Sequence, residues 1–258
     1  MGGATIPGME WIVVTLASLL AGFVDAVVGG GGLILVPALF SAFPSAAPAT
    51  LLGTNKSASV WGTLFSARQY SRRVQFRWGA IAPAIVASFS CSLLGAWAVT
   101  QVSADFLRKL LPLILVALLV YTLAKKQLGQ HHAPRFEGRQ EAWVAVLIGI
   151  GIGFYDGFFG PGTGSFLIFL FIRFFGFDFL HASAASKVVN VATNLAAIGY
   201  FVPNGYFLPA AGVLMASANI GGSFVGAHLA LRHGSGFVRR VFLAVVSVLI
   251  VKFAWDTF

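Results

Sequence analysis

The sequence predicts an all-α, polytopic membrane protein made of two inverted repeats, each of about five hydrophobic segments, with broken helices at glycine-rich stretches. The composition is the first observation behind this prediction. The 258-residue chain is 58% hydrophobic and 10% charged, whereas a soluble domain carries roughly 25% charged residues. A membrane-spanning helix needs about 20 apolar residues, so the length allows about ten segments joined by short loops. The composition therefore excludes an ordinary soluble protein.

An internal duplication is the second observation. Asp25 recurs as Asp156 and Lys56 recurs as Lys187, both at an offset of 131 residues, and Gly95 and Arg108 keep the same offset as Gly226 and Arg239. The stretch Gly-Phe-Val-Asp that begins at residue 22 returns as Gly-Phe-Tyr-Asp at residue 153. A constant offset over most of the chain indicates two copies of one unit.

Apolar segments follow one another in the same order in both copies. In the first copy they cover residues 11–28, 33–43, 51–70, 78–100 and 106–124, and in the second 143–160, 164–176, 182–202, 206–231 and 237–255. We therefore expect residues 1–124 to form a first transmembrane repeat, 125–141 a polar linker and 142–258 a second transmembrane repeat. Five segments per copy would make the second copy enter the membrane from the opposite side, as in many secondary transporters.

The distribution of positive charge is the third observation, and it favours this inverted arrangement. If loop 68–77 is cytoplasmic and the chain keeps that parity, twelve Lys and Arg residues fall on the cytoplasmic side, in the stretches 68–77, 125–139, 173 and 232–240, against three outside. If only the short second segments turned back, the count would drop to eight against six. The net charge of +9 is thus explained by the positive-inside rule rather than by nucleic acid, and both termini are expected outside.

Glycine runs interrupt the first and second segments of each copy. Four consecutive glycines follow Asp25, and Gly-Pro-Gly-Thr-Gly follows Asp156. Small residues such as Gly22 and Gly153 let membrane helices pack closely, but such runs indicate broken helices, which are tolerated at membrane depth where they line a cavity. Freed N–H groups at a helix start attract anions. The substrate-binding residues expected here are Gly29, Gly30, Gly31, Gly32, Gly160, Gly162 and Thr163, with Asp25 and Asp156 as anchors of the breaks or as coupling groups.

A polar stripe that begins with a lysine runs along the third segment of each copy. Lys56, Ser59 and Thr63 share one helical face, as do Lys187, Asn190 and Asn194. An ionisable residue inside a span indicates a functional site, although each lysine could instead extend its amine to the membrane surface. The stripe predicts a cavity wall that includes Asn55, Lys56, Ser59, Lys187, Asn190 and Asn194. We expect the wall to be completed on the fourth segment of each copy, by Ser88, Ser92 and Gly95 in the first and by Asn219, Ser223 and Gly226 in the second.

These paired motifs resemble the TauE/SafE family of sulfite exporters (TSUP), and the resemblance covers residues 10 to 255. The duplicated Gly-Phe-x-Asp-x-x-x-Gly stretch is followed by Thr-Asn-Lys in the first half and by Ala-Ser-Lys in the second. The likeness is strongest to a branch in the bacterial inner membrane. It implies export of sulfite, of sulfonates such as sulfoacetate, or of related small anions.

The sequence therefore predicts a secondary transporter for a small anion in the cell membrane, rather than an enzyme. No nucleophile–base pair and no metal-ligand spacing stands out, so neither a metal nor a cofactor is expected. The partners expected are the anion, the lipid bilayer and a coupling proton or sodium ion. Two alternatives stay open, a passive anion channel and a membrane scaffold or assembly factor that transports nothing. The oligomeric state, the substrate and the direction of transport are left open.

Overall fold

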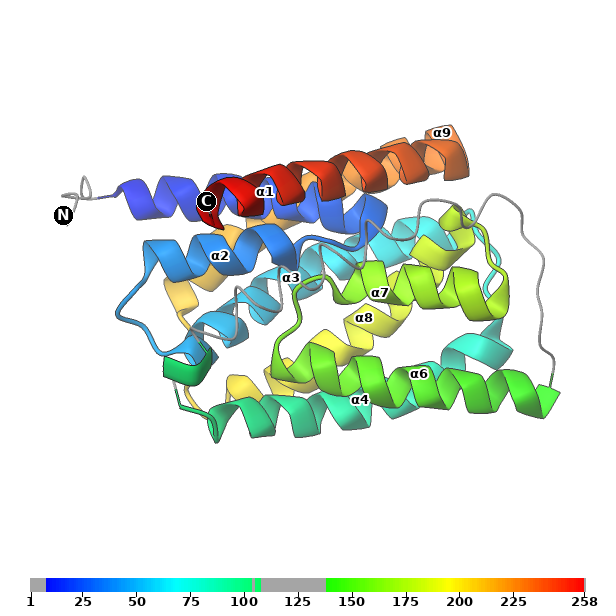
Figure 1. Ribbon diagram of the computed structural model, residues 1–258, viewed down its shortest axis with the longest axis horizontal. Coiled ribbons are helices and arrows are strands. Elements are labelled where there is room, and N and C mark those ends of the chain that lie inside the picture. The colour runs from blue at the N-terminus through cyan, green and yellow to red at the C-terminus, as the bar shows by residue number, and fades with distance from the viewer. Residues whose placement is uncertain (1–7, 104, 108–137, 258) are drawn as a thin grey trace.

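The computed structural model describes residues 8–103, 105–107 and 138–257, and its regular elements are helices (Figure 1). The first copy contains α1 (Met9–Val28), α2 (Gly32–Ala42), α3 (Pro48–Ser71) and α4 (Trp78–Thr100). The second contains α6 (Gly138–Phe158), α7 (Thr163–Leu170) continued by the π-helix η1 (Phe171–Phe175), α8 (Phe179–Phe201) and α9 (Pro209–Thr257). Within the described residues there is no strand, so the all-α prediction is confirmed.

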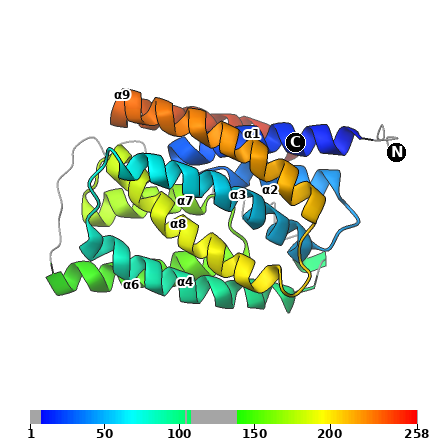
Figure 2. The same ribbon diagram turned by 180° about the vertical axis from the view of Figure 1, so that it is seen from behind.

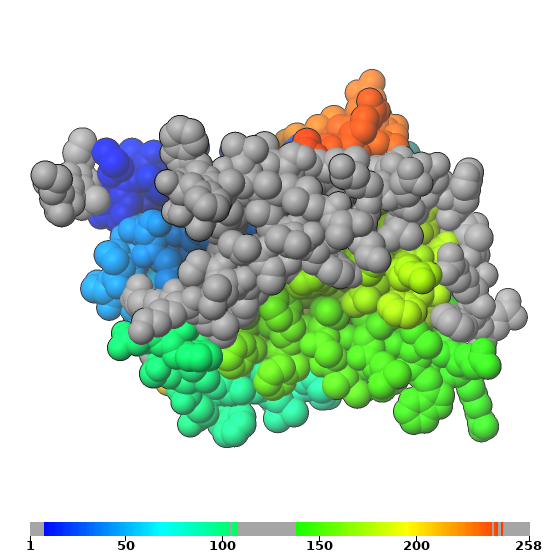
Figure 3. Space-filling model, in the orientation of Figure 1, coloured from blue at the N-terminus to red at the C-terminus, as the bar shows by residue number. Residues whose placement is uncertain are grey.

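Among the residues that the structure describes, four helices are long and apolar enough to cross a membrane: α1, α4, α6 and the part of α9 from Pro209 to Val238. On α6 the exposed residues Trp143, Leu147, Ile150 and Phe154 recur every three or four positions and form one outward stripe. Figure 3 shows α6 forming a broad part of the outer surface. Apolar side chains on the outside are the surface that lipid requires, so the protein is polytopic and membrane-embedded.

The polar helices α3 and α8 lie side by side between the pair α1–α9 and the pair α4–α6 (Figure 2). They contact each other, and α3 also packs on α9 while α8 packs on α4. Thr54, Asn55 and Lys56 of α3 and Asn190, Thr193 and Asn194 of α8 are buried. Polar groups at membrane depth are costly unless they face the protein interior, which explains why these side chains turn inward while Trp61, Leu64 and Leu195 of the same helices are exposed.

The two copies are inverted with respect to each other. In Figure 1, α1 and α3 run from left to right, whereas the corresponding α6 and α8 run from right to left, and Figure 2 shows the same from behind. The copies also exchange partners, because α1 packs on α9 and α6 packs on α4. The inverted repeat expected from the odd number of segments is therefore present in the helices that the structure describes.

In the first copy the short second segment α2 completes a helical hairpin with α1. Trp11 at the start of α1 and Phe43 after α2 have ring centroids 5.8 Å apart, so the hairpin returns the chain to the end where it began. At 1.5 Å per residue the 11-residue α2 is ~16 Å long, about half of the hydrocarbon core. A hairpin and two full crossings both leave the chain on the side of the membrane from which it entered. The Lys and Arg count on each side is therefore the same for either arrangement.

Small residues set the close contacts where the copies exchange helices. A Cβ added to Gly153 would meet the backbone of Ser88 on α4, and one added to Gly22 would meet the backbone of Asn219 on α9. Gly157 approaches Ser92 in the same way. The packing role considered for Gly22 and Gly153 therefore holds, as close helix approach in membranes requires.

The chain bends sharply within α9, at Gly234, whose φ of 70° and ψ of −165° are non-helical. The part after this bend returns toward the end at which α1 starts (Figure 1), as expected for the fifth segment of the second copy. The predicted segment 106–124 lies outside the described residues except for its first two positions, as does most of the linker 125–141. The division into 1–124, 125–141 and 142–258 stays a prediction, and α6 begins at Gly138, inside the stretch assigned to the linker.

Candidate functional site

The two glycine breaks meet in the interior of the protein. The backbones of Gly29 and Gly164 are in direct contact, and a Cβ on either would overlap the other. The Ser165 N–H donates to the Gly29 carbonyl at 3.1 Å, and the Ser165 hydroxyl donates to the Val28 carbonyl at 2.8 Å. A hairpin turn from each copy thus supplies one half of a shared site.

The breaks require glycine because their backbone is left-handed. Gly29 has φ 75°, while Gly160 and Gly162 have φ 94° and 80° on either side of Pro161. Side chains rarely adopt such angles, whereas glycine does so without steric cost. The first copy makes one left-handed turn, and Gly31 then has helical angles at the start of α2. The second copy makes two left-handed turns before α7.

Two ion pairs cross between the copies at this point. Lys56 of the first copy pairs with Asp156 of the second at 2.5 Å, and Lys187 of the second pairs with Asp25 of the first at 3.5 Å. Lys56 and Lys187 are 2% and 0% exposed. This burial rules out the alternative that the lysines extend to the membrane surface. The Thr63 hydroxyl also donates to Asp25, at 3.2 Å.

A cavity of about 20 Å³ lies between the crossed pairs. It is lined by most of the expected site residues, namely Asp25, Gly29, Gly31, Gly32, Asn55, Lys56, Ser59, Asp156, Gly160, Gly162, Asn190 and Asn194. Gly30, Thr163 and Lys187 do not line it in this conformation. Lys187 instead pairs with Asp25, which does line the cavity. A cavity of this size has room for about one water molecule.

Sequence reasoning left four lining residues out of the expected site set: Ala21, Thr63, Gly164 and Asn219. Thr63 and Asn219 had been recognised as members of polar stripes, so the helical spacing did carry a signal. Ala21 and Gly164 line the cavity because the hairpin turns approach closely there, and an apolar or small residue gives no sign of this in the sequence.

The expectation for the fourth segment is wrong in the first copy. Ser88, Ser92 and Gly95 were expected in the cavity wall, but Ser88 and Gly95 pack against α6 and the Ser92 hydroxyl donates to the Thr193 carbonyl at 2.8 Å. Their small size serves helix packing. In the second copy Asn219 does line the cavity, while Ser223 donates to the Gly22 carbonyl and Gly226 packs on Phe23.

Several polar groups around the cavity have no partner within the described part of the chain. These are the side-chain oxygens Oδ1 of Asn55 and Oδ2 of Asp156, while Lys187 Nζ has its ion pair but no hydrogen bond. By contrast, the Asn194 amide donates to Asn190 at 3.2 Å. Buried polar groups without partners are uncommon and occur at functional sites. The site therefore has capacity for a polar ligand.

Two helix starts also lie at the cavity wall. Gly31 and Gly32 begin α2, Gly162 begins α7, and neither start has a side-chain cap. Uncapped helix starts carry partial positive charge and attract anions. Lys56 adds a positive charge beside these helix starts. In the part of the chain that the structure describes, no group of three His, Cys, Asp or Glu could hold a metal ion.

Comparisons with known proteins agree with this architecture. The family model described as "Sulfite exporter TauE/SafE" matches residues 14–253. The chain is 33% identical over 249 residues to "Probable membrane transporter protein YfcA" of Escherichia coli K12, covering 95% of this chain and 90% of that protein. It is 34% identical over 245 residues to "Probable membrane transporter protein ORF9" of a Sinorhizobium species, covering 93% and 91%. A Haemophilus influenzae relative, "Probable membrane transporter protein", is 32% identical over 241 residues.

No solved structure matches the chain. The relatives are bacterial membrane transporters by name, and the helices described above fit a multi-pass membrane protein. Both the family match and the relatives extend over nearly the whole chain, including both glycine breaks and both lysines. This protein is therefore a multi-pass bacterial membrane transporter, not an enzyme, and it belongs to the TauE/SafE family.

Proposed function

We propose that the central cavity is the substrate site of a secondary transporter that exports small sulfur-containing anions, such as sulfite, sulfoacetate or other organosulfonates, across the bacterial inner membrane. The observation that carries this proposal is the pair of crossed Lys–Asp contacts around a buried cavity at the meeting point of two broken helices. The family name supports the choice of sulfite as the first substrate to test.

Access to the site requires movement of the glycine breaks. A cavity of about 20 Å³ is too small for an oxyanion, so the hairpin of one copy must separate from that of the other. Because each wall comes from a different copy, rocking one copy against the other would open the cavity alternately to either side, as in other transporters with inverted repeats. A passive channel would instead need an open path, and the close contact of Gly29 with Gly164 favours a transporter.

The charges at the site indicate how transport could be coupled. Lys56 and Lys187 balance Asp25 and Asp156, so the four groups sum to zero when all are ionised. An anion that enters makes the site negative, which is costly in a low-dielectric interior. A proton on one carboxylate, or a sodium ion, would restore neutrality. We therefore infer that Asp25 or Asp156 carries the coupling function, while structural pinning of the breaks is the competing role.

Proteoliposomes test both parts of the proposal. Vesicles preloaded with unlabelled sulfite or sulfoacetate should take up the labelled anion by counterflow and show a transient overshoot. A channel would equilibrate the label without an overshoot, and a scaffold would match protein-free vesicles. Asp25→Asn or Asp156→Asn should keep this exchange while losing accumulation driven by a proton or sodium gradient.

Asp178→Asn is the matched control, because Asp178 caps α8 away from the cavity and its loss should leave coupling unchanged. Retained gradient-driven accumulation in both cavity variants would reject the coupling role of these carboxylates.

A further inference from the structure

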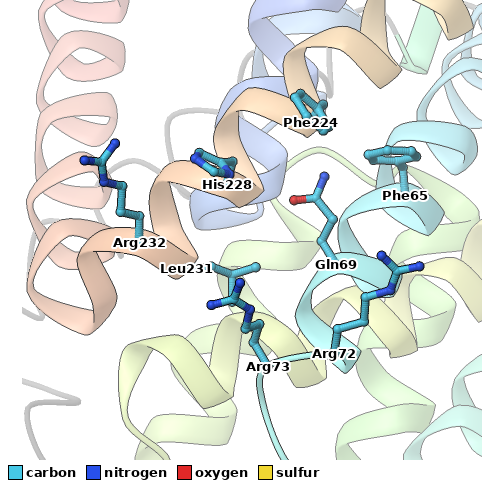
Figure 4. A pocket seen from close by; sticks show the side chains of 8 residues that line it. All are labelled: Phe65, Gln69, Arg72, Arg73, Phe224, His228, Leu231 and Arg232. Carbon is cyan, nitrogen blue, oxygen red and sulfur yellow. The ribbon is translucent and has the colours of Figure 1, made fainter.

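A second pocket lies on the outside of the protein, between α3 and α9. It has a volume of about 450 Å³ and is lined by Phe65, Gln69, Arg72, Arg73, Phe224, His228, Leu231 and Arg232 (Figure 4). No acidic residue is among them. The pocket is separate from the central cavity, with which it shares no lining residue.

The packing of α3 explains why this pocket opens outward rather than toward the centre. Ser66 and Tyr70 are fully buried, and the Tyr70 hydroxyl donates to the Ala26 carbonyl at 3.0 Å, which closes the inner side. At Gly62, α3 touches Asn219 and Ser223 of α9 and closes the groove toward the middle of the membrane. Phe65 and Phe224, 37% and 53% exposed, stand on the outward face below this contact.

The pocket changes from apolar to basic along its length. Figure 4 shows Phe65 and Phe224 at one end, Gln69 between the helices, and Arg72 and Arg73 at the other end. The two aromatic rings are 5.8 Å apart. Arg232 stands on the α9 wall. An anion with an attached apolar chain matches this order of groups.

Several donors of the pocket have no acceptor in the described part of the chain. Gln69 Nε2 is buried and makes no hydrogen bond there. Arg72, Arg73 and Arg232 have no carboxylate within ion-pair distance among the described residues, unlike Arg77, which pairs with Glu141 at 3.3 Å. A buried amide without an acceptor costs free energy, and three guanidinium groups without counter-charges attract phosphate.

The position of the pocket identifies the source of such an anion. It lies at the end of the protein where α3 and the first part of α9 finish, which is the end assigned to the cytoplasm by its excess of Lys and Arg. The cytoplasmic leaflet is rich in anionic lipids, and basic pockets between helices on that side bind their headgroups. We propose that this α3–α9 pocket binds an anionic phospholipid, with its phosphate at the basic end formed by Arg72, Arg73 and Arg232, an ester carbonyl at the Gln69 amide and an acyl chain along Phe65 and Phe224.

Native mass spectrometry of the purified, delipidated full chain tests this proposal. Dioleoylphosphatidylglycerol should bind as a discrete adduct, whereas dioleoylphosphatidylcholine and soluble glycerol phosphate should bind at least tenfold more weakly. Arg72→Gln, Arg73→Gln and Arg232→Gln should each weaken binding of the anionic lipid roughly fivefold, the contribution of one basic residue at an anionic surface. Arg68→Gln removes a charge from the same end but outside the pocket, and should change binding less than twofold.

Three outcomes would overturn the proposal. Glycerol phosphate that binds as tightly as the lipid, with the same dependence on the arginines, would assign the pocket to a soluble anion. An equal loss in Arg68→Gln would reduce the effect to diffuse surface charge. Wild-type binding in all three pocket variants would remove the site. Should an arginine variant unfold, Gln69→Leu replaces it, with an expected loss of at least threefold. The proposal is independent of the substrate site, so lipid binding and transport can fail separately.

Discussion

The two copies share a chain path and differ in the chemistry that each brings to the centre. Ser59 and Thr63 of the first copy correspond to Asn190 and Asn194 of the second, at the offset of 131 residues. Lys56 lines the cavity and lies 2.5 Å from Asp156, whereas the corresponding Lys187 does not line it and lies 3.5 Å from Asp25. Duplication therefore provides the geometry of a two-sided cavity, and divergence decides which lysine lines it.

The breaks differ in the same manner. Gly29 packs against the backbone of Gly164, while the corresponding Gly160 faces the end of the Lys56 side chain. A Cβ at residue 29 would meet backbone atoms, which cannot move aside easily, whereas a Cβ at residue 160 would meet the amine of a flexible lysine, which can. The first break is therefore a rigid backbone contact, and the second lies against the lysine that lines the cavity.

Gly29→Ala should have the largest effect of the changes that test this comparison. The new Cβ would overlap Gly164 in a left-handed backbone, at a cost of about 2–5 kcal/mol from overpacking and conformation together. Thermal unfolding in detergent would measure the loss. Gly160→Ala should cost less, and Gly151→Ala, which meets nothing within 4 Å inside α6, should not lower stability, because alanine is the better helix former. Equal losses for Gly29→Ala and Gly160→Ala would remove the distinction between the breaks.

Neutralising the two ion pairs in turn should separate the roles of the lysines. The double variant Lys56→Met/Asp156→Asn avoids a buried unpaired charge. It should lower the affinity for the anion, measured from anion-dependent thermal stabilisation, at least about tenfold, the value of one lost charge-assisted hydrogen bond. Lys187→Met/Asp25→Asn should retain most of the stabilisation, because Lys187 does not line the cavity. Should the second variant lose as much as the first, the two lysines would be equivalent.

The helix starts of α3 and α8 should show the smallest difference. Asp178 caps α8 by accepting from the His181 N–H at 2.8 Å, whereas Ala47 at the start of α3 makes no such bond. Burial raises the pKa of Asp178, but hydrogen bonds from His181 and Ser235 outweigh it and lower the pKa to about 2.

Asp178→Ala should cost ~1 kcal/mol, or about 2–4 °C in thermal unfolding for a chain of this size. Ala47→Asp, at an exposed position, should recover a similar amount. Because the folded-state pKa of Asp178 is depressed, its contribution is complete above the usual carboxyl pKa and is lost as the pH falls toward 2. A Tm difference between wild type and Asp178→Ala that stays constant from pH 7 to pH 3 would contradict this role.

The amino-acid sequence by itself determined the class of protein, the duplication and most of the cavity residues. Composition decides that the chain belongs in a membrane, and the offset of 131 residues pairs Asp25 with Asp156 and Lys56 with Lys187. Helical spacing places Ser59, Asn190 and Asn194 on the same faces as the lysines, because the period of an α-helix is the same wherever the helix lies. These features are local, and local patterns are visible in a single sequence.

Only the tertiary structure decided which groups face one another. Spacing along one helix could not show that each lysine pairs with the aspartate of the other copy. Nor could it show that Ser88 packs on α6, that Ser92 donates to the Thr193 carbonyl, or that Lys187 does not line the cavity. These relations depend on how α1 crosses α9 and how α6 crosses α4. The crossings are set by backbone contacts at Gly22 and Gly153, where the absence of a side chain permits the approach.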